Sequence, residues 1–122
     1  MENEHNEAWE QKQLIQWAKQ KPWGRYLYHI ANESVGGYAW VARNRQMGSR
    51  KGFPDLGLPI PMGDFHGLYI ELKRASGGTL SKEQRQWLKA LKTFGYRAEV
   101  CHGWEEAAKV LEEYMNEKDQ DD

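Results

Sequence analysis

Apolar residues recur along the chain with two different periods, and the switch between them predicts alternating helices and strands. Spacings of three and four residues predict helices at residues 8–19, 82–94 and 104–115. Short apolar runs bounded by turn residues predict strands at residues 26–30, 53–58, 68–73 and 96–101. The order α-β-β-β-α-β-α predicts the α/β class, with a mixed β-sheet flanked by helices.

Turn and capping residues set the limits of several elements. Ser81 and Gln84 form the pattern of a capping box, which predicts a helix start at residue 82, and Gly95 is a typical helix stop. Residues 38–42 are ambiguous: they fit a short strand, or part of a loop that continues to Gly52.

Composition and charge narrow the class of protein. The 122 residues support one domain, which we expect over residues 1–116, followed by an acidic, disordered tail over residues 117–122. Cys101 is the one cysteine, so no intrachain disulfide is possible and an intracellular, cytoplasmic protein is expected. No apolar run has the length of a membrane span, and the first residues lack the apolar core of a signal peptide. The net charge of −1 means that a nucleic-acid-binding face would have to come from a local concentration of basic residues.

The strand at residues 68–73 carries the candidate chemistry. Its even-numbered residues are apolar, while Glu71 and Lys73 share the other face. If the preceding strand pairs with it in antiparallel fashion, Asp55 comes close to Glu71. Two converging carboxylates bind a hard cation such as Mg²⁺ or Mn²⁺, and a neighbouring lysine can polarise water or stabilise charge on a phosphate.

The first helix offers a third carboxylate. At about 100° per residue, Glu7 and Gln11 share the face of the helix that carries its apolar stripe, while Glu10 lies towards the edge of that stripe. This argument favours Glu7 over Glu10, and a shift of three residues would exchange them. Taken singly, each of these features has an ordinary structural explanation, such as a surface ion pair or a favourable charge at a helix start.

Together, and in this order, the motifs resemble a known family. The segments GFPD (52–55), ELK (71–73) and SKEQRQWL (81–88), with the leading Glu7 and Gln11, resemble the virus-type replication-repair nuclease (VRR-NUC) domain of the PD-(D/E)xK nuclease superfamily. The resemblance implies a restriction-endonuclease-like core and phosphodiester hydrolysis with Mg²⁺ or Mn²⁺. It implies Glu7, Asp55, Glu71 and the backbone carbonyl of Leu72 as metal ligands.

The remaining roles also follow from the resemblance or from charge. The resemblance implies that Lys73 orients or activates the attacking water, and that Gln84 and Gln11 support the site. A basic stretch between Glu33 and Asp55 contains no acidic residue, and we expect it to contact DNA phosphates, extended by Lys73, Arg74 and Lys82. The expected DNA-binding residues are Arg43, Arg45, Arg50, Lys51, Asn32 and Gln11.

The sequence thus predicts a metal-dependent, structure-selective DNA endonuclease. The resemblance favours a homodimer of phage or bacterial origin that cuts branched DNA such as Holliday junctions in repair, because a two-fold dimer presents two equivalent sites to a two-fold junction. The alternatives are a monomeric nuclease directed at flaps or nicks and a non-catalytic DNA-binding module. No small-molecule cofactor and no membrane partner are expected.

Overall fold

A four-stranded mixed sheet forms the centre of the molecule, in the order β1-β2-β3-β4. The computed structural model describes residues 4–31 and 37–120, and the side chains of these residues up to residue 116. The strands are β1 (Tyr28–His29), β2 (Leu56–Leu58), β3 (Leu68–Lys73) and β4 (Arg97–His102). The first three are antiparallel neighbours, whereas β4 runs parallel to β3.

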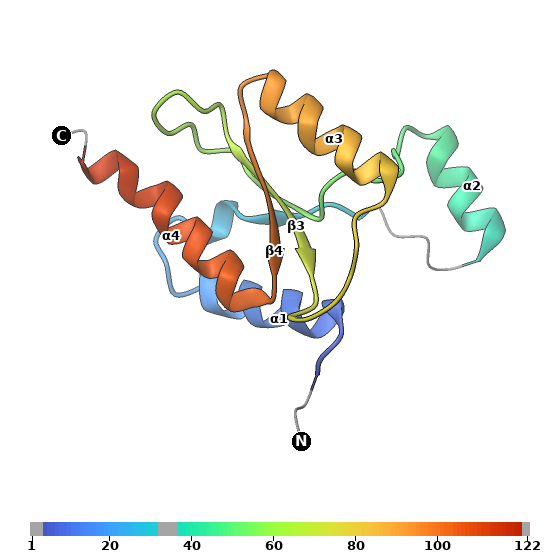
Figure 1. The fold of residues 1–122 in the computed structure, drawn as a ribbon, viewed down its shortest axis with the longest axis horizontal. Helices are drawn as coiled ribbons and strands as arrows, with labels where there is room; N and C mark the ends of the chain where they lie inside the picture. Colours follow the sequence, from blue (N-terminus) through green and yellow to red (C-terminus); the bar gives the residue numbers. More distant parts are fainter. Residues whose placement is uncertain (1–3, 32–36, 121–122) are drawn as a thin grey trace.

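Helices cover both faces of the sheet (Figure 1). On one face α1 (Glu7–Ala18) and α4 (Trp104–Gln120) pack on the larger core, and on the other face α3 (Lys82–Thr93) packs on a smaller, aromatic-rich core. Leu14, Leu111 and Tyr114 from the two helices join the even-numbered leucine and isoleucine side chains of β3 in the larger core. This mixed sheet with flanking helices is the restriction-endonuclease-like α/β fold predicted from the sequence.

The regular alternation of β3 has the predicted bounds, but both of its faces are buried. Glu71 is 2% exposed and Lys73 is 7% exposed, because α3 and the segment before it cover this side of the strand. Buried charged groups need hydrogen-bonding partners. The burial therefore means that these two side chains have a defined environment rather than a solvated one.

The start of α3 is the predicted capping box. Ser81 Oγ accepts a hydrogen bond from the backbone N–H of Gln84, and Gln84 Oε1 accepts one from the backbone N–H of Ser81. The apolar face of this helix consists of Leu88 and Leu91, which are buried, and of Trp87, which packs beside them.

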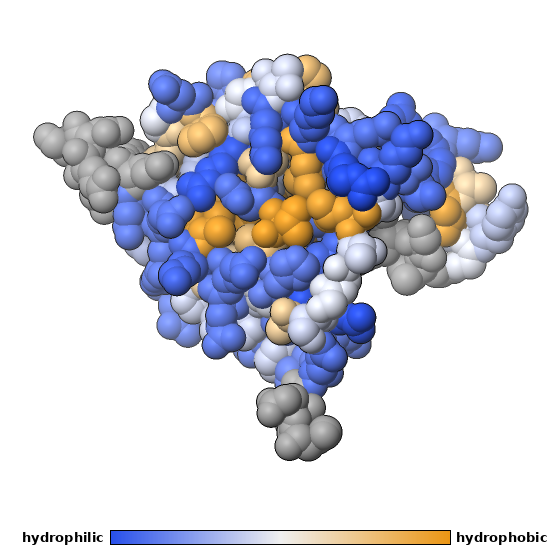
Figure 2. All heavy atoms as spheres, viewed as in Figure 1, coloured by the Kyte–Doolittle hydropathy of each residue, from blue (hydrophilic) through white to orange (hydrophobic). Residues whose placement is uncertain are grey.

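Strand β4 forms one edge of the sheet, and a charged side chain protects it from pairing with a further strand. Apolar side chains gather along β4 between α3 and α4, on the face seen in Figure 2. Arg97, which lies on β4, forms ion pairs with Glu99 and with Glu113 of α4 over 3.0 and 2.9 Å. A charged side chain held at a sheet edge disfavours pairing with a further strand.

The ambiguous segment at residues 38–42 is a helix, so both sequence interpretations of it were wrong. Helix α2 (Tyr38–Gln46) follows Gly37 and stands apart from the sheet, beside the N-terminal end of α3 (Figure 1). The aromatic and β-branched residues at its start resemble a strand, but alanine, arginine and glutamine dominate the segment and favour a helix. None of its residues is buried.

Other boundaries differ by a few residues. The predicted first strand divides into a 3₁₀ turn (Gly24–Tyr26) and the two residues of β1, and the second strand begins only at Leu56 because Pro54 cannot donate to a sheet ladder. Helix α4 continues over residues 117–120, where the sequence predicts a disordered tail. In the described part of the chain, no helix has the length and apolar character needed to cross a membrane.

Candidate functional site

Asp55 and Glu71 lie side by side at one end of the β2–β3 pair. The last paired residues there are Leu56 and Ile70, so the next step of the antiparallel register brings Asp55 opposite Glu71. The backbone of Asp55 is fixed by the N–H of Ile30, which donates to its carbonyl over 2.7 Å. Its side-chain Oδ2 accepts a hydrogen bond from the N–H of Leu72 over 2.8 Å. The predicted meeting of these two carboxylates is therefore present in the structure.

The same register leaves the carbonyl of Leu72 without a donor from β2. One step beyond the Asp55–Glu71 position, Pro54 comes opposite Leu72, and proline has no N–H. The carbonyl of the next residue, Lys73, accepts from the N–H of Gly103 on the β4 side. Because successive carbonyls of a strand point to opposite sides, the carbonyl of Leu72 points to the side where Asp55 lies. Leu72 lines a hollow there together with Asp55. Its carbonyl oxygen is thus available to a ligand in that hollow.

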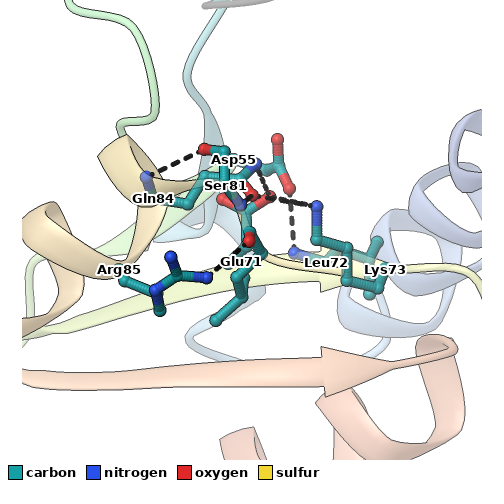
Figure 3. Close-up of polar contacts among 8 residues, drawn as sticks. Asp55, Glu71, Leu72, Lys73, Ser81, Gln84 and Arg85 are labelled. Carbon is teal, nitrogen blue, oxygen red and sulfur yellow. Dashed lines mark hydrogen bonds and ion pairs between the residues drawn. The ribbon is translucent and has the colours of Figure 1, made fainter. Parts of the chain in front are cut away.

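A compact network holds Glu71 and Lys73 (Figure 3). Gln84 Nε2 donates to Glu71 Oε2 over 2.9 Å, while Lys73 Nζ lies 3.5 Å from the same oxygen. Lys73 Nζ also donates to Gln84 Oε1 over 3.2 Å. Gln84 therefore contacts the carboxylate and the ammonium group at once, and its position is set by the capping box of α3.

Burial raises the pKa values of both carboxyl groups. Burial raises the pKa of Glu71 to about 8, and the neighbouring charge of Asp55 contributes in the same direction, while Lys73 opposes it. Burial is also the largest cause of the raised pKa of Asp55, and the hydrogen bond from the Leu72 N–H lowers that pKa in part. Glu71 Oε1 is buried and has no hydrogen-bond donor among the described residues. The pair is therefore short of positive charge, although Lys73 lies beside it.

The two candidate carboxylates of α1 have different surroundings. Glu7 is exposed and lines the hollow that contains Asp55, and its charge contributes to the raised pKa of Asp55. Glu10 is 4% exposed, and its Oε1 accepts a hydrogen bond from the backbone N–H of Trp104 over 2.8 Å at the start of α4. Glu10 is thus engaged in joining two helices, and the geometry favours Glu7 as the carboxylate that faces the pair.

The residues expected to contact DNA are not gathered in one place. Gln11 lines the hollow with Glu7 and Asp55. Arg43 and Arg45 lie on α2, whereas Lys51 lines a separate hollow against α3. Arg50 lies in the connection between α2 and β2. Asn32 falls outside the described residues.

The sequence alone does not show why the GFPD segment contains a glycine. Gly52 has a φ of +87°, and a Cβ on it would lie 2.7 Å from the backbone of Glu83. A side chain would therefore separate the segment that carries Asp55 from the start of α3, which carries Gln84. The sequence signal was the position of this glycine three residues before Asp55.

No group of three or more Asp, Glu, His or Cys side chains within residues 4–31 and 37–116 is close enough to hold a metal ion unaided. The oxygen atoms that the structure does bring together come from Asp55, Glu71 and the backbone of Leu72. A cation at this position would be bound by two carboxylates and a carbonyl, with Glu7 at the rim of the hollow.

Fold and site define an α/β protein in which a carboxylate pair and a lysine lie at one end of a central sheet. Comparison with protein families identifies it further: the model of the VRR-NUC domain matches residues 2–105, so the chain belongs to this family of nuclease domains. A solved structure described as a VRR_NUC domain protein is similar, with a TM-score of 0.82, 26% identity, and coverage of 93% of this chain and 91% of that one. No curated protein matches the chain.

Proposed function

We propose that the chain is a divalent-metal-dependent DNA endonuclease whose reaction centre is formed by Asp55, Glu71 and Lys73. Membership of a nuclease family supports phosphodiester hydrolysis as the reaction. The single observation that carries the proposal is the buried contact between the two carboxylates and the ammonium group of Lys73, held together by Gln84.

The residues fit a cation such as Mg²⁺ or Mn²⁺. The buried carboxyl group of Glu71 and the half-buried one of Asp55 have raised pKa values, and Glu71 Oε1 has no hydrogen-bond donor among the described residues, so a positive charge would stabilise the site. Carboxylate and carbonyl oxygens are the ligands that these hard ions prefer. Asp55, Glu71, the Leu72 carbonyl and Glu7 would hold the ion. Bound there, it would supply Lewis-acid activation of the phosphodiester and lower the pKa of water.

The protein groups would act mainly by position and charge. Lys73 would orient the attacking water and stabilise negative charge that develops on the phosphate. Gln84 would keep the Lys73 ammonium and the Glu71 carboxylate in register, since it bonds to both. Gln11 would support the site from the wall of the hollow that contains Asp55, where it lies beside Glu7.

We further propose that the substrate is branched DNA and that the active form is a homodimer. A two-fold dimer offers two equivalent reaction centres to a four-way junction. Helix α2 and the residue that caps its C-terminus expose apolar side chains that are typical of interface residues, with Tyr38 92% exposed and Met47 77% exposed. The arginines of the same helix, with Arg50, Lys51 and Asn32, would contact phosphates and position the DNA without reading its sequence.

A cleavage panel tests the proposal. Single-stranded, duplex, flap and four-way DNA are each incubated with the chain and Mg²⁺, Mn²⁺ or EDTA. We expect cuts in the four-way substrate with either ion and none with EDTA. Binding without cleavage under every condition would indicate a non-catalytic DNA-binding module. A preference for flaps or nicks by a chain that sediments as a monomer would overturn the junction-resolving homodimer.

A further inference from the structure

A second hollow adjoins the one that contains Asp55. Glu7 and Ala8 line both, so the two meet at the first turn of α1. The walls of the second hollow are completed by Asn6, Lys73, Arg74, Gly78 and Thr79. They come from the start of α1, the end of β3 and the connection from β3 to α3, which run close together in Figure 1.

The two cations in this hollow differ in their engagement. Lys73 is buried and contacts Glu71 and Gln84. Arg74 is exposed, and it takes part in none of the ion pairs among the described residues. The proposed reaction centre uses Lys73, whereas the sequence predicts for Arg74 only a general contact with DNA phosphates, at no stated position relative to the cut.

The turn after Arg74 keeps the hollow open. Gly77 and Gly78 have φ values of +76° and +77°, which L side chains rarely adopt. A Cβ on Gly77 would lie 3.1 Å from a guanidinium nitrogen of Arg74, and one on Gly78 would lie 3.6 Å from the side chain of Lys73. Side chains on these two glycines would therefore occupy space beside both cations.

The lining of the second hollow suits a phosphate group. A guanidinium group binds phosphate oxygens strongly, and the hydroxyl of Thr79 and the amide of Asn6 are further donors. Glu7 is the one carboxylate in its described lining, and it faces the proposed metal. A strand whose scissile phosphate lies at Asp55 and Glu71 must leave the reaction centre on two sides, and the second hollow adjoins that centre directly.

We propose that Arg74 binds a backbone phosphate of the DNA strand within two linkages of the scissile one, on a single side of the cut. The inference rests on the proposed nuclease function. Arg74 is then a positioning residue: it places the scissile phosphate against Asp55, Glu71 and Lys73 without contacting the reacting atoms. Because a phosphate contact carries no base information, its effect is independent of sequence.

Single neutral linkages test this assignment. The cut position is mapped first on unmodified DNA with Mg²⁺ or Mn²⁺. Each phosphate within three linkages of the cut is then replaced in turn by an uncharged methylphosphonate, and kcat/KM is measured for the wild type, Arg74→Gln and Arg74→Lys. Lys89→Gln is the matched control, because it removes one positive charge from an exposed residue of α3 that lines neither hollow.

The expected result is a coupling at one position. One neutral linkage lowers kcat/KM of the wild type and of Lys89→Gln about tenfold, as expected for loss of one charge-assisted hydrogen bond. Arg74→Gln loses about the same factor on unmodified DNA and nothing further at that linkage, whereas Arg74→Lys retains part of the coupling. Equal melting temperatures of the variants exclude a folding effect.

Two failures are distinguishable. If the wild type cuts DNA but the Arg74→Gln loss adds to that of every neutral linkage alike, the phosphate contact is overturned and the nuclease assignment stands. If the wild type cuts no DNA with either ion, the proposed function fails and this inference falls with it.

Discussion

Gln84 Nε2 donates to Glu71 Oε2 over 2.9 Å, so a capping residue of α3 also holds a carboxylate of the proposed reaction centre. Its Oε1 accepts from the backbone N–H of Ser81 and from Lys73 at the same time. The hydrogen bonds that start the helix therefore also fix the relative position of Glu71 and Lys73. Folding of this helix end and assembly of the site depend on one side chain.

Substitutions at the cap separate these two roles. Ser81→Ala removes a capping bond and is expected to cost about 1 kcal/mol of unfolding free energy with little change in kcat. Gln84→Glu keeps an acceptor suited to the capping box but places a third carboxylate against Glu71. We expect it to retain most of the stability and to lose at least tenfold in cleavage. Thermal melts and single-turnover cleavage measure both, and equal kcat losses in the two variants would contradict the separation.

Much of this site follows from local sequence patterns, because strand register and capping are local properties. The alternation of β3 and the capping signal at Ser81 predict where Glu71, Lys73 and Gln84 lie, and antiparallel pairing then brings Asp55 beside Glu71. The contact of Glu10 with Trp104 joins residues 94 positions apart, and no local pattern indicates it. Helix α2 was missed for another reason: it buries no residue, so it has no apolar stripe to reveal its period.

Removal of the ammonium group from the site tests the role of Lys73. Lys73→Met keeps much of the buried side-chain volume while it removes the charge beside Glu71. We expect cleavage to fall at least a hundredfold, whereas binding of DNA without metal changes less than threefold, because Lys73 is 7% exposed and pairs with protein groups. Fluorescence anisotropy with labelled DNA and cleavage assays on the same preparation give both values. Equal losses of binding and cleavage would show that Lys73 contributes to DNA affinity and not to the reaction.

The two glutamates of α1 should respond in opposite ways. Glu7→Gln removes a charge that faces Asp55, so we expect weaker Mn²⁺ binding and at least tenfold less cleavage with unchanged stability. Glu10→Leu removes the acceptor of the Trp104 N–H in a buried position, which should cost about 1–3 kcal/mol of unfolding free energy. Metal titration, cleavage and thermal melts are needed for both variants. A loss of Mn²⁺ affinity in the Glu10 variant alone would reverse the assignment.

The close approach of the Gly52 backbone to Glu83 predicts that a side chain at position 52 destabilises the fold. An alanine there would require a left-handed backbone and would bring its Cβ within 2.7 Å of Glu83. We expect Gly52→Ala to destabilise the fold by about 1–3 kcal/mol and to lower cleavage, since the Asp55 segment and the start of α3 would move apart. Gly48→Ala is the matched control: it also has a positive φ, but open space surrounds it. Similar effects on cleavage at both glycines would show that only backbone strain matters.

The raised pKa of Glu71 predicts how stability changes with pH in the absence of metal. The pKa of Glu71 is about 8 in the folded protein and 4.5 in an ordinary environment. Between these two pH values the carboxyl group is neutral in the folded protein and ionised in the unfolded chain. Unfolding therefore releases a proton between these values, so this group's contribution to stability is complete below about pH 4.5 and is lost as pH rises through about 8. We expect chemical denaturation in EDTA to show that the unfolding free energy declines from pH 5 to 8. This decline should be smaller in Glu71→Gln than in the wild type, by on the order of 1–3 kcal/mol. Mn²⁺ should offset the decline in the wild type, because ion binding favours the ionised pair. Parallel pH profiles of the two proteins in EDTA would show that Glu71 is not the group that titrates.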